Sequence, residues 1–276
     1  MTVSFKNIII YYLSFFYVNN VSGFRQNGGG SSGGLTRVNR KIGKSPSCSD
    51  TGTQCLLFFT GGSNLFQSNI YGEFIEVLES RDIDVYDVPF NYELSQKDID
   101  DLYSGCYCDC DYGYQGVNIM GHSSGCTTMM NQCVGLRGIN HVFLLDPVNT
   151  NFFEDDWKIK IINDDNNDND GIMSLSFIRA MKSYKITFDP FGLPFIPVFE
   201  LMAKDLYLYV DNKISISVNV VKNLDFEDFG HSDILNQHLS DFMHNIRLSV
   251  GNRNRGVEVR QKYFKTILSF ILKTIS

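Results

Sequence analysis

Short apolar runs alternate with longer amphipathic segments over most of the chain from Cys55 onward. Residues 55–59 form a continuous apolar run that ends at a glycine pair. Such a run is typical of a strand buried on both faces of a parallel sheet. Comparable runs predict further strands at residues 83–88, 117–120, 141–145, 196–201 and 217–221.

Segments with helical periodicity separate these runs. Ile70, Phe74, Ile75 and Leu78 recur at a spacing that places them on one helix face. Further helices are predicted at residues 96–103, 124–136, 234–246 and 257–275. Strands that alternate with helices imply a three-layer α/β sandwich with a mostly parallel central sheet, here reduced at its N-terminal edge. In such sheets, ligands bind beyond the carboxyl ends of the strands.

The N-terminal part of the chain has a different character. Lys6 precedes the apolar run 8–18, and small residues follow up to Gly23, which is the layout of a secretory signal peptide. We therefore expect residues 1–23 to be a signal peptide and the protein to be secreted; a buried strand and a membrane anchor are the alternatives. Residues 24–50 are rich in Gly and Ser and carry basic side chains, which predicts a flexible linker before one domain over residues 51–276.

Composition and net charge bear on which class of partner the protein binds. The 276 residues are 43% hydrophobic and carry a net charge of −7, which fits one globular domain and argues against a nucleic-acid partner. The basic amphipathic segment 257–275 is expected to pack on the sheet, and peripheral membrane contact is its second interpretation. Cys106, Cys108 and Cys110 lack a nearby fourth ligand, so no metal site is expected there.

The segment "VNIMGHSSGCTTMM" places Gly121-His122-Ser123-Ser124-Gly125 between a predicted strand and a predicted helix. This is the context of a nucleophile elbow, a sharp strand-to-helix turn with an exposed serine hydroxyl at its tip. Glycines on either side let the serine adopt a strained backbone conformation. We therefore expect Ser123 to be a nucleophile and the Ser124 N–H to face a developing oxyanion.

A serine nucleophile needs a general base, and His231 is the best placed of the five histidines. It follows the last predicted strand and precedes a helix whose N-cap could be Ser232. His122 lies inside the elbow and is expected to have a packing role. His141 begins a strand, and His238 and His244 lie on the flank of the helix predicted at residues 234–246.

The base needs a carboxylate that fixes its tautomer. Asp146 ends a predicted strand, and Pro147 stops that strand, which puts the carboxylate at the sheet edge beside the elbow. Asp205 follows a later predicted strand and is the second choice. The loop after the first strand is expected to supply the other oxyanion donor, Gly62 or, next in order, Ser63.

Together these segments resemble chlorophyllase and the related dienelactone-hydrolase-like serine esterases of the α/β-hydrolase superfamily. "LLFFTGGSNL" is similar to the oxyanion loop of that family, "VNIMGHSSG" to its elbow, "LLDPVN" to its acid segment and "DFGHSDIL" to its histidine segment. The resemblance implies an α/β-hydrolase fold with Ser123 as nucleophile, Asp146 as acid and His231 as base. Thr60 and Ser124 stand where the family has histidine and arginine, which bears on the substrate more than on the chemistry.

The expected reaction is cleavage of a carboxylic ester through an acyl-enzyme, with no cofactor and no metal. The oxyanion donors are Gly62 and Ser124, and Ser63, Asn64 and Leu65 are expected to bind substrate. Aromatic residues near the predicted loops suggest a small-molecule or lipid-like ester with an apolar group: Phe90, Tyr92, Phe152, Phe153, Phe191 and Phe195. The rival hypothesis is a binding or structural protein that has the hydrolase fold without its activity.

Overall fold

The computed structural model describes residues 35–38, 54–61, 68–89, 92–105, 113–133, 136–147, 174–180, 187–188, 194–195, 221–245 and 257–276. Several expectations lie outside these residues. They include the signal peptide, most of the predicted linker, the strand predicted at 196–201, residues 217–220 of the next predicted strand, and Asp205. The cysteine cluster at 106–110 and the aromatic residues Phe90, Phe152, Phe153 and Phe191 also lie outside.

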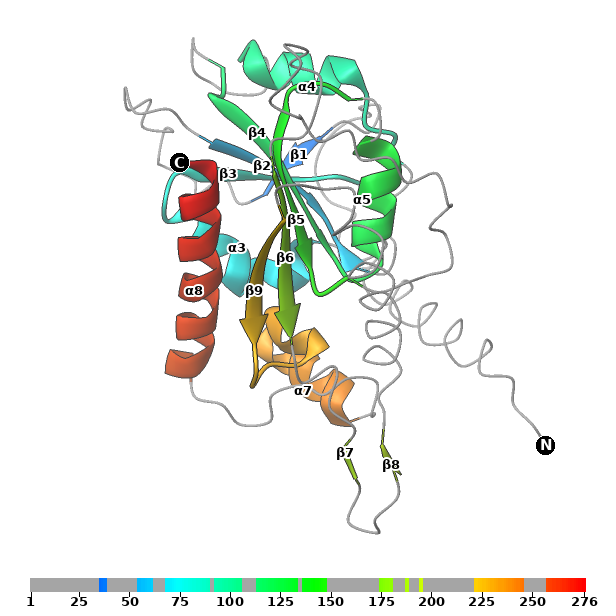
Figure 1. Cartoon of the computed structure of the whole chain (residues 1–276), viewed down its shortest axis with the longest axis vertical. Coiled ribbons are helices and arrows are strands. Elements are labelled where there is room, and N and C mark those ends of the chain that lie inside the picture. Colours follow the sequence, from blue (N-terminus) through cyan, green and yellow to red (C-terminus); the bar gives the residue numbers. More distant parts are fainter. Residues whose placement is uncertain are drawn as a thin grey trace, which may run out of the picture. The chain divides into compact units, whose positions relative to one another are not determined.

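A seven-stranded sheet forms the centre of the described domain (Figure 1). Its order is β1-β3-β2-β4-β5-β6-β9, and only β1 runs antiparallel to its neighbour. The strands are β1 Thr36–Arg37, β2 Gln54–Phe59, β3 Ile83–Asp87, β4 Gly116–His122, β5 Ile139–Leu145, β6 Ser174–Ala180 and β9 Val221–Phe226. The expected mostly parallel sheet is confirmed.

Helices cover both faces of this sheet. On one face lie α4 (Gln96–Tyr103) and α5 (Gly125–Cys133), and on the other lie α3 (Gly72–Glu79) and α8 (Val257–Ile275) (Figure 1). Two 3₁₀ turns, η1 (Ser68–Tyr71) and η3 (His231–Ile234), precede α3 and α7 (Gln237–Asn245), respectively. The strands β7 (Thr187–Phe188) and β8 (Pro194–Phe195) form a small separate hairpin. The predicted three-layer arrangement is therefore present.

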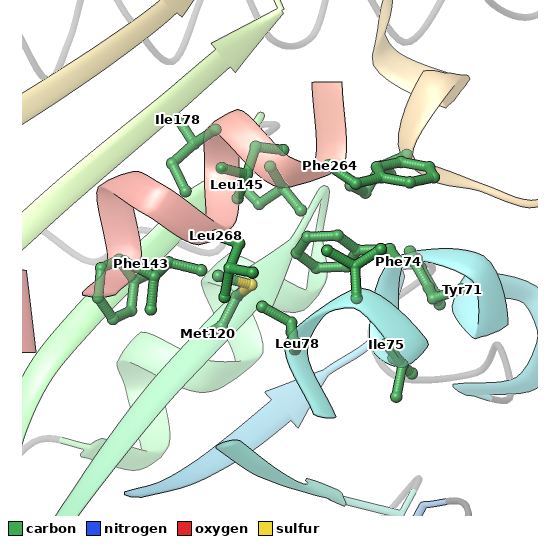
Figure 2. Close-up of a cluster of buried hydrophobic side chains, with 14 of the residues drawn as sticks. Tyr71, Phe74, Ile75, Leu78, Met120, Phe143, Leu145, Ile178, Phe264 and Leu268 are labelled. Atoms are coloured by element: carbon green, nitrogen blue, oxygen red, sulfur yellow. The ribbon is translucent and has the colours of Figure 1, made fainter. Parts of the chain in front are cut away.

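Alternate residues of each strand enter two different cores, because successive side chains of a strand point to opposite faces. In β2, Leu57 packs on the face of α4 and α5, whereas Leu56 and Phe58 pack on the face of α3 and α8. The second core joins Phe74 of α3 to Phe264 of α8, with ring centroids 5.7 Å apart (Figure 2). Strands buried on both faces explain the continuous apolar runs of the sequence.

The amphipathic segment at the C-terminus forms α8 over the predicted residues Val257–Ile275. Its buried face, which includes Phe264, Ile267 and Ile271, packs on the sheet and α3. Lys262 and Lys265 lie on the exposed side. Among the helices in the described ranges, none has both the length and the apolar character that a membrane crossing requires.

Three strands of the seven-stranded sheet differ from the sequence-based expectation, and the β7–β8 pair was not predicted either. The strand β1 lies inside the segment assigned to a linker, and there the linker prediction is wrong: Val38 N–H donates to Val85 O at 2.9 Å, and Arg37 pairs with Asp84. The strand β6 was not predicted, because its apolar residues alternate with polar ones, including the buried Ser174 and Ser176. The last strand begins at Val221, where the predicted one ends.

Candidate active site

Ser123 occupies a sharp turn between β4 and α5. Its backbone has a φ of 57°, in the left-handed region that residues other than glycine rarely adopt. The Ser123 N–H donates to Leu145 O of the neighbouring strand at 3.1 Å, which fixes the turn against β5. The geometry is that of the nucleophile elbow predicted from the sequence.

The two glycines around the turn are required for different reasons. A Cβ atom at Gly121 would lie 2.7 Å from Cys126 Cα, at the start of α5. A Cβ atom at Gly125 would lie 2.2 Å from Thr60 O and 2.6 Å from Phe59 O, at the end of β2. The first glycine therefore permits the tight turn, whereas the second lets α5 approach the neighbouring strand.

His231 is the first residue of η3 and reaches the elbow through its side chain. Its Nε2 atom lies 2.9 Å from Ser123 Oγ, and its Nδ1 atom lies 2.6 Å from Asp146 Oδ2. The three side chains are buried, with residue exposures of 4% for His231, 5% for Ser123 and 2% for Asp146. The structure thus brings together the three residues that the sequence analysis selected.

Asp146 follows β5 directly and has a φ of 39°. Its backbone N–H donates to Ile178 O at 2.7 Å, and its Oδ1 atom accepts the Ala180 N–H at 3.0 Å. The second oxygen remains for His231. The unpredicted strand β6 therefore holds the Asp146 backbone through Ile178 and its carboxylate through Ala180.

Contacts within the histidine segment fix its backbone. The Gly230 N–H donates to Asp233 Oδ2 at 2.8 Å, and Ser240 Oγ donates to Asp233 Oδ1 at 3.3 Å. Asp233 is 1% exposed, so this carboxylate ties the turn to α7 from inside. The expected N-cap role of Ser232 is wrong: it lies within η3, and α7 begins at Gln237.

Arg260 holds the same segment from α8. Its guanidinium donates to Asp233 O at 3.2 Å and to Leu235 O at 2.5 Å, and it pairs with Glu73 of α3 at 3.1 Å. Arg260 is 2% exposed. The pattern Gly-His-x-Asp predicted the histidine, but no signal in the sequence pointed to this arginine, which lies 27 residues after Asp233.

Aromatic rings provide the apolar part of the same support. Phe229 stacks on Tyr263 of α8, with ring centroids 3.9 Å apart and planes 10° apart, and Phe226 meets Tyr263 edge-on. Burial raises the pKa of the Tyr263 hydroxyl well above its usual value, and the nearby carboxylates of Asp233 and Asp146 add to the effect. Tyr263 therefore stays neutral beside the site.

His122 was expected to have a packing role only, but its ring nitrogens also make contacts with Tyr71 and His231. Tyr71 Oη lies 2.8 Å from His122 Nδ1, and His122 Nε2 lies 3.2 Å from His231 O. The His122 and His231 rings are stacked at 4.8 Å. Burial first, and then the neighbouring His231, lower the pKa of His122 well below its usual range.

The expected oxyanion donors are described only in part. Ser124 is 7% exposed and directly precedes Gly125, the first residue of α5. Gly62, Ser63, Asn64 and Leu65 lie outside the described residues. The adjacent Gly61 N–H donates to Tyr71 Oη at 2.9 Å, so this N–H already has a hydrogen-bond acceptor inside the protein.

No group of three or more His, Cys, Asp or Glu side chains within the described ranges is arranged to hold a metal ion. The chemistry available in this arrangement is that of a hydroxyl, an imidazole and a carboxylate in hydrogen-bonded series. Such a series can deprotonate the hydroxyl as it attacks an electrophilic carbon.

The mostly parallel sheet, its flanking helices and the strand–turn–helix at Ser123 define the α/β-hydrolase fold. Neither the scan against protein-family models nor the search of curated proteins finds a match to this sequence.

Solved structures of similar fold include three hydrolases. MGS-M1, an α/β hydrolase from a Medee basin deep-sea metagenome, shares 10% identity at a TM-score of 0.47, over 86% of this chain and 98% of its own. Est1E from Butyrivibrio proteoclasticus shares 10% identity at a TM-score of 0.45, over 88% of this chain and 99% of its own. The butyrate-bound esterase Est2 from Thermogutta terrifontis shares 12% identity at a TM-score of 0.44, over 79% of this chain and 91% of its own. These identities are too low to transfer a substrate or a reaction.

Proposed function

We propose that this protein is a serine hydrolase that cleaves a carboxylic ester, with Ser123 as nucleophile, His231 as general base and Asp146 as the acid that orients the base. The single observation that carries the proposal is the continuous series Ser123 Oγ–His231–Asp146, with separations of 2.9 Å and 2.6 Å. The strained φ of 57° at Ser123 supports it, because such strain is retained at functional turns.

In the proposed reaction, His231 Nε2 takes the proton of Ser123 Oγ while that oxygen attacks the ester carbonyl carbon. The tetrahedral oxyanion is held by the Gly62 and Ser124 N–H groups, each of which lowers the barrier by about 3 kcal/mol. The imidazolium then returns its proton to the alcohol, which leaves an acyl group on Ser123. A water molecule, deprotonated by His231, releases the carboxylic acid by the same steps in reverse order.

The proposed substrate is a small-molecule or lipid-like ester with an apolar acyl or alcohol group, as in the chlorophyllase-like esterases. The acid segment "DPV" and the histidine segment "GHSD" support this class, together with the aromatic residues of the sequence. Ser63, Asn64 and Leu65 are the proposed substrate contacts. We also propose that the protein is secreted. The basic face of α8 is the proposed contact with a membrane surface.

A fluorophosphonate probe tests the nucleophile directly, because it phosphonylates only an activated serine. The purified protein should be labelled at Ser123, Ser123→Ala should not be labelled, and His231→Ala should be labelled far more slowly. p-Nitrophenyl esters of increasing acyl length, assayed beside chlorophyll, then define the substrate. A folded wild-type protein that resists the probe would instead support the rival hypothesis of a non-catalytic binding protein.

A further inference from the structure

Three hydrogen bonds connect the loop after β2 to the histidine segment through the interior. The Gly61 N–H donates to Tyr71 Oη at 2.9 Å, Tyr71 Oη lies 2.8 Å from His122 Nδ1, and His122 Nε2 lies 3.2 Å from His231 O. Tyr71 is fully buried and His122 is 3% exposed. The series ends on the backbone of the proposed base, not on its ring.

The chemistry of its two ends fixes the direction of this series. A carbonyl oxygen can only accept, so the contact with His231 O requires a proton on His122 Nε2. A neutral imidazole then has a lone pair on Nδ1, which accepts the proton of the Tyr71 hydroxyl. The Gly61 N–H can only donate, and the Tyr71 oxygen accepts it. The donor and the acceptor of each hydrogen bond are therefore fixed, and His122 is held as the Nε2-protonated tautomer.

The surroundings of His122 favour the neutral ring. Among the described residues, the titratable groups in contact with it are Tyr71 from η1 and His231 from η3. Burial first, and then the charges of Cys126 of α5 and Asp87 of β3, raise the pKa of the Tyr71 hydroxyl, which therefore stays protonated. His231 itself contacts Ser123 and Asp146.

A neutral His122 matters to the reaction because its ring is stacked on His231, with planes 26° apart. The general base becomes an imidazolium during the reaction, and a second positive ring at 4.8 Å would oppose that charge. The same neutral ring also holds the carbonyl of the residue that carries the base.

We propose that His122 and Tyr71 are positioning residues for the ester hydrolysis, and this inference rests on the proposed function. His122 orients His231 through the backbone carbonyl, and the Tyr71 hydroxyl selects the tautomer that makes this bond. Tyr71 also ties Gly61, at the start of the proposed oxyanion loop, to the same series. Neither residue touches the reacting atoms.

The tautomer can be observed without any activity. Long-range ¹H–¹⁵N correlation spectra of protein with ¹⁵N-labelled histidine distinguish protonated from unprotonated ring nitrogens. We expect the His122 signal, identified by its loss in His122→Gln, to show a protonated Nε2 and a bare Nδ1 from pH 5 to pH 8. In Tyr71→Phe, the same ring should become a mixture of tautomers.

The kinetic test compares a variant that keeps the donor with one that lacks it. His122→Gln places an amide N–H near the position of Nε2, whereas His122→Met has similar bulk and no donor. We expect His122→Met and Tyr71→Phe to lower kcat for p-nitrophenyl butyrate by about 10- to 100-fold with little change in KM, since the base is misplaced and not the substrate. His122→Gln should recover most of the loss.

The outcomes separate this inference from the proposed function. If wild-type Ser123 reacts with the fluorophosphonate but His122 titrates in this range or carries its proton on Nδ1, the inference is wrong and the esterase proposal stands. Full kcat in a folded His122→Met protein overturns it equally. If the wild-type protein does not react with the probe, both proposals fall, even where the spectra show the expected tautomer. Should His122→Met not fold, Tyr71→Phe and the wild-type spectra still decide.

Discussion

The Asp146 carboxylate and the His231 imidazole, 85 residues apart in the chain, are joined by a hydrogen bond of 2.6 Å between Oδ2 and Nδ1. Both side chains are at least 96% buried from solvent, and the second carboxylate oxygen accepts the Ala180 N–H. The carboxylate therefore has one oxygen for the scaffold and one for the imidazole, which orients the ring with Nε2 toward Ser123.

Asp146→Asn should leave the fold in place and remove this orientation. The amide oxygen can still accept from Ala180, but the amide N–H₂ would then face His231 Nδ1 and favour the wrong tautomer. We expect kcat for a p-nitrophenyl ester to fall by about 10³- to 10⁴-fold. Asp225→Asn is the control, because Asp225 lies on the edge strand β9 with its side chain 39% exposed and pairs with Arg179 of β6. Equal activity of the two variants would remove Asp146 from the proposed mechanism.

Gly125→Ala should destabilise the protein, because its methyl group would lie 2.2 Å from Thr60 O. Neither the backbone of β2 nor the start of α5 can move freely, so we expect a loss of about 2–3 kcal/mol in the free energy of unfolding. Gly72→Ala is the matched control at the first residue of α3, where the nearest heavy atom would be 3.9 Å away. Urea denaturation compares the two, and similar stabilities would contradict the predicted clash.

Arg260→Leu should weaken the attachment of the histidine segment to α8. The substitution leaves the Asp233 and Leu235 carbonyl oxygens without this donor inside the protein. Each loss costs on the order of 1–3 kcal/mol, so the unfolding free energy should drop by at least about 2 kcal/mol. Lys262→Leu, on the exposed side of the same helix, should stay close to wild type. An unchanged melting temperature in Arg260→Leu would show that these contacts do not stabilise the fold.

Asp87 should make stability depend on pH in the direction opposite to most carboxylates. Burial raises its pKa from 3.8 to about 6, although hydrogen bonds from Ser68 oppose the shift. A raised pKa means that the protonated form stabilises the fold. This contribution is complete below pH 3.8 and is lost as pH rises through about 6.

Asp87→Asn keeps an acceptor for Ser68 and cannot ionise. Relative to wild type, it should therefore gain about 2 kcal/mol in unfolding free energy between pH 4 and pH 7, which urea denaturation at several pH values measures. Glu76→Gln, on the exposed side of α3, is the control. A difference between Asp87→Asn and wild type that is the same at pH 4 and pH 7 would show that Asp87 is not perturbed in this way.

Local patterns predicted the elements whose own residues decide their structure. The apolar run ending at Phe59 became β2, and the amphipathic segments at Gln96–Tyr103 and Val257–Ile275 became α4 and α8 with the predicted bounds. Strands with few apolar residues were harder to predict from these local patterns. The strand β6 has buried serines, and β9 is a polar edge strand, because their places in the sheet come from neighbouring strands and not from a run of apolar side chains.

The sequence by itself determined the strands and helices from β2 to β5, the turn that carries Ser123, and Asp146 and His231 as candidate partners, because glycines, apolar runs and strand ends are local signals. Only the tertiary structure decided what surrounds these residues. Ala180, Arg260 and Tyr71 reach the site from strands and helices distant in the chain, and Tyr71 does so through His122 of the elbow. Hydrogen bonds between such distant groups leave no spacing or periodicity in the sequence, since they depend on how the packed elements meet.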